Sequence, residues 1–361
     1  MKHQDEFRDG ALTRKIAAKL QETSTKPVRL MEICGTHTMS IFRHGLRTLL
    51  PPTITLVSGP GCPVCVTAIE EIDRAVRLAR TPGVRVATFG DLIRVPGSES
   101  SLKEETAAGA KVAVVYSAMD ALKSAWDHPD EEVVFLGIGF ETTAPTVAAA
   151  VQRAAQTQTG NFSILSAHKL LPPAMNALLA DQDVRIDGFL CPGHVTTIIG
   201  AEPYRRVAER YRTPCVVTGF EPVDILQGIL MLSELIEADR AEVVIQYKRA
   251  VSPAGNPKAR AVMDEVFTPV DARWRGLGLI PLSGLGLRDD FRVYDARQRF
   301  DLEVPPAAEP PGCRCSDVLR GVAVPPDCRL FRNLCTPDRP VGPCMVSGEG
   351  TCAAYFKYQT G

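Results

Sequence analysis

Residues 54–65 read ITLVSGPGCPVC, and this stretch decides how the fold is interpreted. Its first four residues are apolar or β-branched, and the run 54–58 predicts a strand buried on both faces of a parallel sheet. A Gly-Pro-Gly turn follows, and residues 66–80 then carry apolar side chains at helical spacing, at Ile69, Ile72, Val76 and Ala79. The stretch therefore predicts a strand, a tight turn and a helix in succession.

Strand-like and helix-like segments alternate along the first two thirds of the chain. The apolar, β-branched runs are 54–58, 84–88, 112–117, 133–138, 162–166, 188–190 and 215–218. The helix-like segments are 66–80, 119–126, 144–157, 202–211 and 222–237, and a short amphipathic helix precedes them at 9–20. Strands that alternate with helices predict βαβ units, and hence an α/β fold with mainly parallel sheets.

Two changes in this pattern suggest how the chain is divided. Residues 127–132 are polar and contain a proline, which indicates a boundary between two similar α/β units, and Gly-Phe-Glu occurs twice, at 139–141 and 219–221, each time after a strand and before a helix. After about residue 238, residues 241–250 and 257–267 are helix-like, but no long periodic element follows them. We expect an N-terminal helix in 1–27, α/β domains in 28–130 and 131–238, and a helical, loop-rich cysteine domain in 239–361.

The composition and charge exclude several classes of protein. Of the 361 residues, 45% are hydrophobic and 23% charged, which excludes wholesale disorder. The net charge of −1 gives no electrostatic attraction to nucleic acid or to an anionic membrane. No apolar stretch approaches the roughly 18 residues of a membrane helix, and the N-terminus has no secretory pattern. We therefore expect no membrane insertion, no nucleic-acid partner and a cytoplasmic location.

The cysteines are the most informative part of the composition. There are 11, and six of them lie in the last 49 residues. Secreted domains held by disulfides are shorter and have their cysteines spread throughout. The distribution favours a reducing compartment and metal or redox chemistry.

The first cysteine motif is the Cys62-x-x-Cys65 pair, which lies between a predicted strand and a predicted helix. This is the context of thiol–disulfide chemistry, and a helix N-terminus is expected to lower the cysteine pKa and make the pair reactive. The alternative is half of a structural zinc site, which usually combines two closely spaced ligand pairs.

The second motif is Glu-Ile-Cys-Gly-Thr-His-Thr at 32–38, which contains Cys34 and His37. A lone cysteine is often a small buried hydrophobe, but here a glycine, two threonines and a histidine surround it. A soft thiolate beside an imidazole can hold iron, copper or zinc. Both interpretations of Cys34, as ligand or nucleophile and as structural thiol, stay open at this point.

The third motif is the C-terminal cysteine series, in which four members have gaps of 14, 6 and 16 residues: Cys313, Cys328, Cys335 and Cys352. Four thiolates from a loop-rich segment can hold an iron–sulfur cluster, whose ligands come from well-separated loops. Structural zinc more often uses short gaps, so the spacing favours a cluster. Cys315 and Cys344 are then surplus.

Several turns that follow predicted strands form a fourth set: 137–143, 166–169, 191–194 and 219–222. In open α/β sheets the functional site lies at the carboxyl ends of the strands, where we expect all of these turns and the Cys62/Cys65 pair. A histidine in such a turn is as often structural as catalytic. The chain lacks the third glycine of a dinucleotide fingerprint and has no phosphate-binding loop.

Taken together, these motifs resemble the HypD family of [NiFe]-hydrogenase maturation proteins. The resemblance rests on residues 31–38 (MEICGTHT), 59–65 (GPGCPVC), 139–145 (GFETTAP), 192–195 (PGHV) and 342–347 (GPCMVS). It extends from about residue 30 to residue 356, with the motifs in the same order.

The resemblance implies a scaffold that assembles the Fe(CN)2CO group of the hydrogenase, together with a small HypC-type chaperone and HypE. It implies that Cys34 holds the nascent iron, that Cys62 and Cys65 are a redox pair, and that His37 matches a histidine of the same motif. It assigns a [4Fe-4S] cluster to four cysteines: Cys313, Cys328, Cys335 and Cys352. Such a protein is a redox-active assembly scaffold rather than a conventional turnover enzyme.

One residue departs from the family pattern, and one alternative function stays open. Many members of the family carry a second histidine where this chain has Met39, and a thioether cannot transfer protons. The alternative is a thiol–disulfide oxidoreductase in which Cys62 and Cys65 are catalytic and the C-terminal cysteines bind structural zinc. No role follows for Cys191, Cys215, Cys315 or Cys344.

Overall fold

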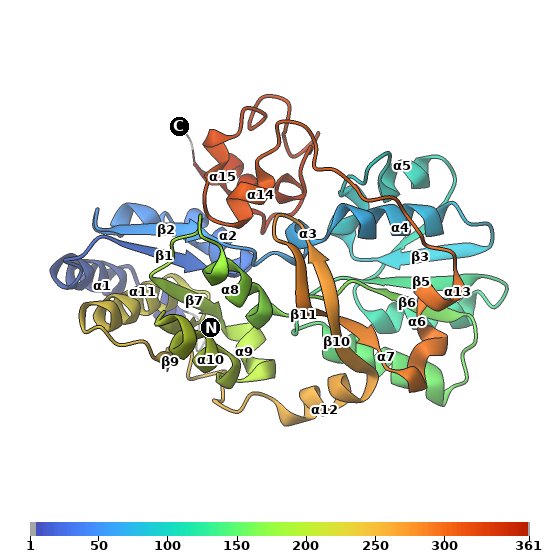
Figure 1. Cartoon of the computed structure of the whole chain (residues 1–361), viewed down its shortest axis with the longest axis horizontal. Helices are drawn as coiled ribbons and strands as arrows, with labels where there is room; N and C mark the ends of the chain where they lie inside the picture. The colour runs from blue at the N-terminus through green and yellow to red at the C-terminus, as the bar shows by residue number, and fades with distance from the viewer. Residues whose placement is uncertain (1–4, 360–361) are drawn as a thin grey trace.

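The computed structural model describes residues 5–359, so residues 1–4 of the expected N-terminal segment and residues 360–361 lie outside it. Two parallel sheets lie side by side, an antiparallel hairpin lies between them, and the C-terminal segment packs above their junction (Figure 1). The α/β fold with parallel sheets is therefore confirmed.

The first sheet has its strands in the order β2 (Ile54–Ser58), β1 (Val28–Glu32), β7 (Gly188–Pro192), β8 (Cys215–Thr218) and β9 (Val243–Ile245). The second has the order β4 (Lys111–Val114), β3 (Val84–Thr88), β5 (Glu132–Gly137) and β6 (Phe162–Ser166). All neighbouring strands in both sheets pair in parallel. The chain thus begins in the first sheet, crosses to the second for β3 to β6, and returns.

The order of the strands in the two sheets bears on the domain boundary expected at 127–132. The boundary expected at 127–132 does not separate the two sheets, because β5 begins at Glu132 and pairs with β3 from the preceding segment. The sequence pattern could not reveal this, because the pairing of strands distant in the chain is a tertiary property.

Fifteen α-helices are assigned within residues 5–359. Their bounds are α1 (Gly10–Thr23), α2 (Gly35–Arg43), α3 (Pro63–Val66), α4 (Ile69–Ala79), α5 (Leu102–Ala107), α6 (Ala118–Asp127), α7 (Ala144–Gln156), α8 (Leu171–Ala180), α9 (Gly193–Ile199), α10 (Glu202–Tyr211), α11 (Pro222–Glu237), α12 (Pro257–Val266), α13 (Ala296–Arg299), α14 (Cys315–Leu319) and α15 (Thr351–Tyr358). Six short 3₁₀ helices join them: η1 (Asp5–Arg8), η2 (Leu46–Leu49), η3 (Gly90–Arg94), η4 (Asp289–Tyr294), η5 (Pro325–Asp327) and η6 (Pro343–Met345). Among these residues, none of the helices combines the length and apolar character that crossing a bilayer requires.

Three predictions after residue 60 were wrong in detail. The helix expected over 66–80 is α4, which begins only at Ile69, and the residues at and just before the expected start form the separate short helix α3. The segment 241–250 is not helical but contains β9, whose three β-branched residues were too short a run to stand out. Within the segment 239–361, expected to be helical and loop-rich, β10 (Phe267–Trp274) and β11 (Gly278–Leu287) form an antiparallel hairpin.

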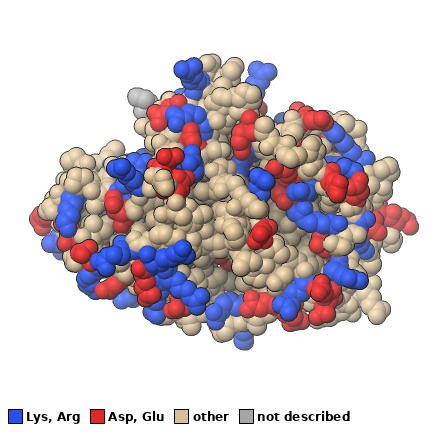
Figure 2. All heavy atoms as spheres, in the orientation of Figure 1, with Lys and Arg blue, Asp and Glu red and all other residues tan. Residues whose placement is uncertain are grey.

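One buried core joins the two sheets to the C-terminal segment. It contains Met31 of β1, Val86 of β3 and Cys315 of α14. Smaller clusters lie under α6 and α7 on the second sheet and under α1 and α11 on the first. On the face seen in Figure 2, positive and negative side chains are interspersed, which agrees with the near-zero net charge.

Candidate functional site

Cys34 lies at the junction of β1 and α2, at the carboxyl edge of the first sheet. It is the residue immediately before α2 and is only 2% exposed. The Gly-Pro-Gly turn packs directly against it: Gly35 N–H donates to the Gly61 carbonyl at 3.0 Å, and a Cβ on Gly61 would lie 2.0 Å from the Cys34 nitrogen. The two motifs that the sequence suggested separately therefore form one site.

The buried carboxylate of Glu32 holds the Cys34 backbone through a hydrogen bond. Glu32 accepts hydrogen bonds from the Cys34 N–H at 3.2 Å and from the Thr38 hydroxyl at 2.6 Å. Burial raises the pKa of Glu32 to about 7, and burial likewise raises the pKa of the Cys34 thiol to about 12. Cys34 is therefore a neutral thiol at pH 7, and a coordinating metal ion would deprotonate it.

The imidazole beside Cys34 belongs to His194 rather than to His37. The His194 Nδ1 lies 4.0 Å from the Cys34 Sγ, whereas the His37 Nε2 lies 2.9 Å from both the Gly219 carbonyl and the Thr218 hydroxyl. Burial lowers the pKa of both histidines to about 4, so both are neutral at pH 7. His194 lies in the first turn of α9, directly after β7, and the sequence pointed to it through its position after a predicted strand and through the PGHV motif at 192–195.

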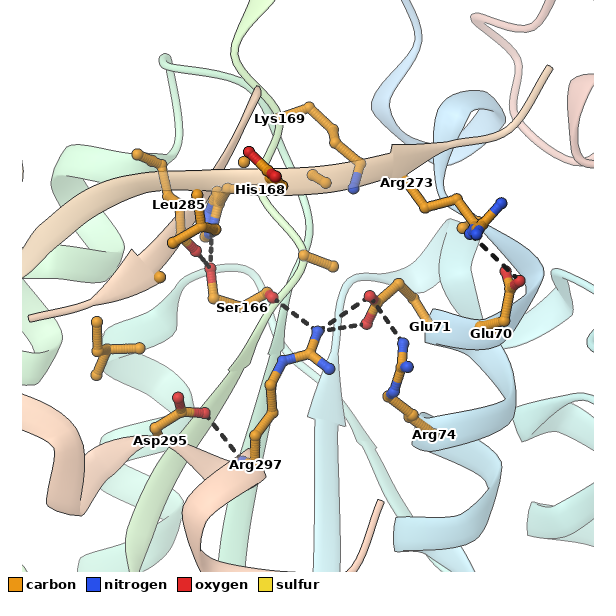
Figure 3. A pocket seen from close by; sticks show the side chains of 18 of the residues that line it. Glu70, Glu71, Arg74, Ser166, His168, Lys169, Arg273, Leu285, Asp295 and Arg297 are labelled. Carbon is orange, nitrogen blue, oxygen red and sulfur yellow. Dashed lines mark hydrogen bonds and ion pairs between the residues drawn. The ribbon is translucent and has the colours of Figure 1, made fainter. Parts of the chain in front are cut away.

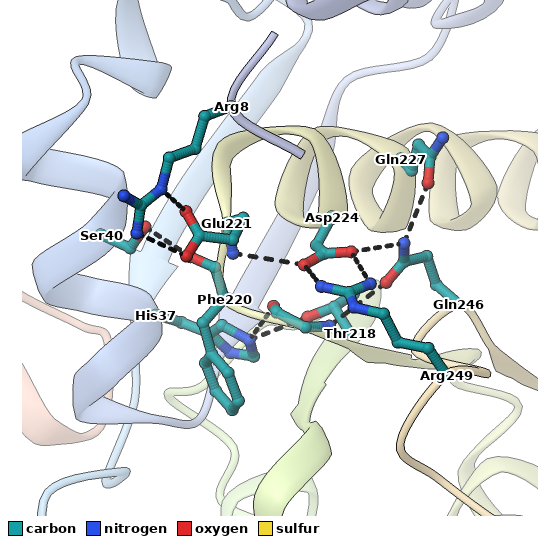
Figure 4. A network of polar contacts seen from close by, with 11 residues as sticks. Arg8, His37, Ser40, Thr218, Phe220, Glu221, Asp224, Gln227, Gln246 and Arg249 are labelled. Atoms are coloured by element: carbon teal, nitrogen blue, oxygen red, sulfur yellow. Dashed lines mark hydrogen bonds and ion pairs between the residues drawn. The ribbon is translucent and has the colours of Figure 1, made fainter. Parts of the chain in front are cut away.

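The loop at 218–221 contacts the His37 ring through Thr218 and Gly219, and a network of charged and polar groups holds it in place (Figure 4). Phe220 lies between the two imidazoles, with ring centroids 4.8 Å from His37 and 5.1 Å from His194. The fully buried Asp224 pairs with Arg249 through two contacts of 2.5 and 2.7 Å. The backbone N–H of Glu221 donates to Asp224 at 3.3 Å, so this ion pair fixes the loop.

Cys62 is the residue immediately before α3, and Cys65 lies within this one-turn helix. The Cys62 Sγ accepts a hydrogen bond from the Cys65 N–H at 3.4 Å, and the two thiols hydrogen-bond with each other. They are 4% and 0% exposed. The expectation of a lowered pKa is wrong for Cys65, because burial raises its pKa far more than a one-turn helix can lower it.

The six C-terminal cysteines line one pocket together with four apolar side chains, Val318, Leu330, Phe331 and Met345. The cysteines are Cys313, Cys315, Cys328, Cys335, Cys344 and Cys352. The pocket thus contains the four cysteines expected for a cluster and the two that the spacing left over. Soft thiol donors in an apolar surrounding fit an iron–sulfur group. Within residues 5–359, no three His, Cys, Asp or Glu side chains converge so that they could hold a single metal ion.

The C-terminal segment connects this pocket to the other two motifs. The Cys344 thiol hydrogen-bonds with Cys65, with Cys315 and with Cys352. At the Cys34 motif, Glu349 accepts a hydrogen bond from the Thr36 hydroxyl at 2.7 Å, and a Cβ on Gly35 would lie 2.6 Å from the Glu349 Cβ. Sequence reasoning missed both Cys344 and Glu349, because their roles depend on contacts across about 280 residues or more.

The chain is similar to known proteins over nearly its whole length. The family model HypD, described as "Hydrogenase formation hypA family", matches residues 11–359. The chain is 47% identical over 367 residues to the hydrogenase maturation factor HypD of Azotobacter vinelandii, covering 99% of this chain and 97% of the relative. It is 48% identical over 368 residues to the HypD of Rhizobium leguminosarum bv. viciae, with coverage of 99% and 96%. It is 45% identical over 370 residues to that of Rhodobacter capsulatus, with coverage of 99% and 98%.

Proposed function

We propose, from the premise that the chain belongs to the HypD family of hydrogenase maturation factors, that Cys34 holds an iron ion while cyanide and carbonyl ligands are assembled on it. The observation that carries the proposal is the surrounding of the Cys34 thiol. It is enclosed by the Gly61 backbone, supported by Glu32 and contacted by a neutral imidazole of His194.

A single protein thiolate suits an iron ion that is bound transiently and is not a permanent cofactor. Cyanide and carbonyl bind best to electron-rich, low-valent iron, and a soft thiolate is a suitable ligand for such iron. The remaining coordination positions are then free for the incoming ligands and for a second thiolate from a HypC-type chaperone. HypE is the partner proposed to deliver the cyanide-forming group.

The redox part of the proposal assigns electron exchange to Cys62 and Cys65. Oxidation of the dithiol to a disulfide releases two electrons and two protons, and reduction takes them up again. The contact between Cys65 and Cys344 supports a path to the cysteine pocket. A [4Fe-4S] cluster held there by Cys313, Cys328, Cys335 and Cys352 would supply electrons one at a time.

In this scheme, the other residues of the chain position and shield the iron site. The neutral His194 and the Glu32 carboxylate orient the Cys34 side chain and backbone, and Phe220 lies between the rings of His37 and His194. The second imidazole of the family pattern is replaced by Met39, so no proton transfer is assigned to that position.

Infrared spectroscopy tests the proposal. The protein co-purified with its small chaperone should show cyanide and carbonyl bands, and the Cys34→Ala variant should lack them. Cys215→Ala, which removes another buried thiol at a strand of the first sheet, is the matched control and should keep the bands. Bands that persist in Cys34→Ala would exclude Cys34 as the iron ligand.

The alternative, a thiol–disulfide oxidoreductase with structural zinc, is not favoured, because the relatives are hydrogenase maturation factors. Anaerobic purification separates the two: a brown protein with acid-labile sulfide fits the cluster, and a colourless protein with zinc fits the alternative.

A further inference from the structure

A cavity of about 540 Å³ opens beside the β10–β11 hairpin (Figure 3). Its walls come from the start of α4, from the residues that follow β6, and from β10 and β11. None of the cysteines lines it. The residues after β6 stand at the carboxyl edge of the second parallel sheet, which is where ligands bind in α/β folds.

The distinctive residue of this cavity is Lys169. It is only 2% exposed, and its backbone is fixed by a hydrogen bond from its N–H to the Gly139 carbonyl at 2.9 Å. Figure 3 shows its amine pointing into the space above the Glu71 carboxylate. Among residues 5–359, no hydrogen bond or ion pair of 4.0 Å or less is formed by the Lys169 ammonium. Lysine is almost never buried without a partner, since removing a charge from water is costly unless it is paired.

The nearest carboxylate is already satisfied by other cations. Arg297 approaches the two oxygens of Glu71 at 2.8 and 3.0 Å, and Arg74 approaches at 3.0 Å. The neighbouring Glu70 faces Arg273 at 3.7 Å. Glu70 and Glu71 thus form their ion pairs with arginines, and neither of them forms one with Lys169. Burial lowers the pKa of Lys169 to about 8, so it is still largely protonated at pH 7.

We propose that this cavity binds a small organic molecule through a single carboxylate, which pairs with the Lys169 ammonium. The volume lies within the range of small-molecule sites. A singly charged carboxylate fits better than a phosphate dianion because four acidic side chains line the same walls: Glu70, Glu71, Asp271 and Asp295. Apolar side chains of the hairpin, such as Val270 and Leu285, offer contacts for the carbon skeleton.

Binding to the whole chain is measured by calorimetric titration with acetate, pyruvate and benzoate as probes and with inorganic phosphate as the dianion. At least one monocarboxylate should bind more tightly than phosphate. Lys169→Met should weaken that binding at least tenfold, because it removes a charge-assisted hydrogen bond. Lys258→Met, at an exposed position on α12, is the matched control and should bind like the unaltered protein.

The thermal midpoint of the ligand-free protein separates a binding role from a structural one. Lys169→Met removes a buried, unpaired charge, so its midpoint should be no lower than that of the unaltered protein. If the variant nevertheless fails to fold, Val270→Trp fills the cavity from a wall position that is 37% exposed and should abolish binding. The proposal is overturned if no monocarboxylate binds, if phosphate binds more tightly, or if binding survives in these variants.

Discussion

Replacement of Gly61 by alanine tests most directly how the two cysteine motifs fit together. A Cβ at this position would lie 2.0 Å from the Cys34 nitrogen and 2.3 Å from both the Cys34 Cα and the Ile33 carbonyl carbon. Ordinary van der Waals contact begins at 3.4 Å, so the two backbones must separate by more than an ångström. No flexible side chain is available to absorb the movement. The separation also stretches the hydrogen bond from Gly35 to Gly61.

The cost follows from these two effects. Overpacking of a buried site costs about 1–3 kcal/mol, and loss of a backbone hydrogen bond costs about 1 kcal/mol. We expect Gly61→Ala to lower the free energy of unfolding by about 2–4 kcal/mol and to displace Cys34 enough to suppress hydrogenase maturation.

The assay combines urea unfolding of the whole chain with infrared spectra of the complex purified with its small chaperone. Gly348→Ala is the matched control, because a Cβ there meets nothing within 4 Å, although the residue adjoins Glu349 at the same site. The control should change the free energy of unfolding by no more than about 0.5 kcal/mol. A Gly61→Ala protein that matches this control in stability and keeps its cyanide and carbonyl bands would refute the reasoning.

Three further changes test the surrounding structure. Cys344→Ala should keep iron and sulfide in the cysteine pocket but slow the re-reduction of the oxidised Cys65 pair several-fold, measured by thiol alkylation after addition of a reductant. Burial raises the pKa of Glu141 from 4.5 to about 7, so the native state retains a proton that the unfolded state has lost, and stability falls as pH rises through this window. Glu141→Gln should remove about 3 kcal/mol of that fall, measured by urea unfolding at pH 5 and pH 8. Arg249→Met leaves the buried Asp224 without its partner and should cost about 3–5 kcal/mol in thermal or urea unfolding.

The sequence predicted the elements that have a strong local signal. All seven apolar runs correspond to strands of the two sheets, and six of these strands are mostly buried, as expected for parallel strands that are apolar along their length. The exception is the edge strand β4, whose Val114 is 51% exposed. The central strand β1, with the sequence VRLME, was missed because an arginine and a glutamate interrupt it. That glutamate is Glu32, whose burial depends on contacts with Cys34 and Thr38 that form only in the folded chain.

For the candidate site, the sequence predicted the cysteine motifs but not the contacts between them. Cysteine spacing identified the motifs, because only cysteine side chains can carry out thiol chemistry. Spacing could not indicate that His37 bonds to Gly219 or that His194 lies beside Cys34, since both depend on how the carboxyl edge of the first sheet is assembled. The position of Cys344 against Cys65 depends on docking of the C-terminal segment and has no local signal.

This docked segment couples the two ends of the proposed electron path. Cys344 contacts Cys65, and five residues later Glu349 packs against Gly35 beside Cys34. Gly350, which follows Glu349, packs against the residue that contacts Cys65, because a Cβ on Gly350 would lie 2.2 Å from the Cys344 carbonyl oxygen. If a ligand of the cysteine pocket shifts this segment and thereby changes the affinity of the Cys34 site for iron, linkage requires that iron at Cys34 changes the affinity of the pocket by the same factor.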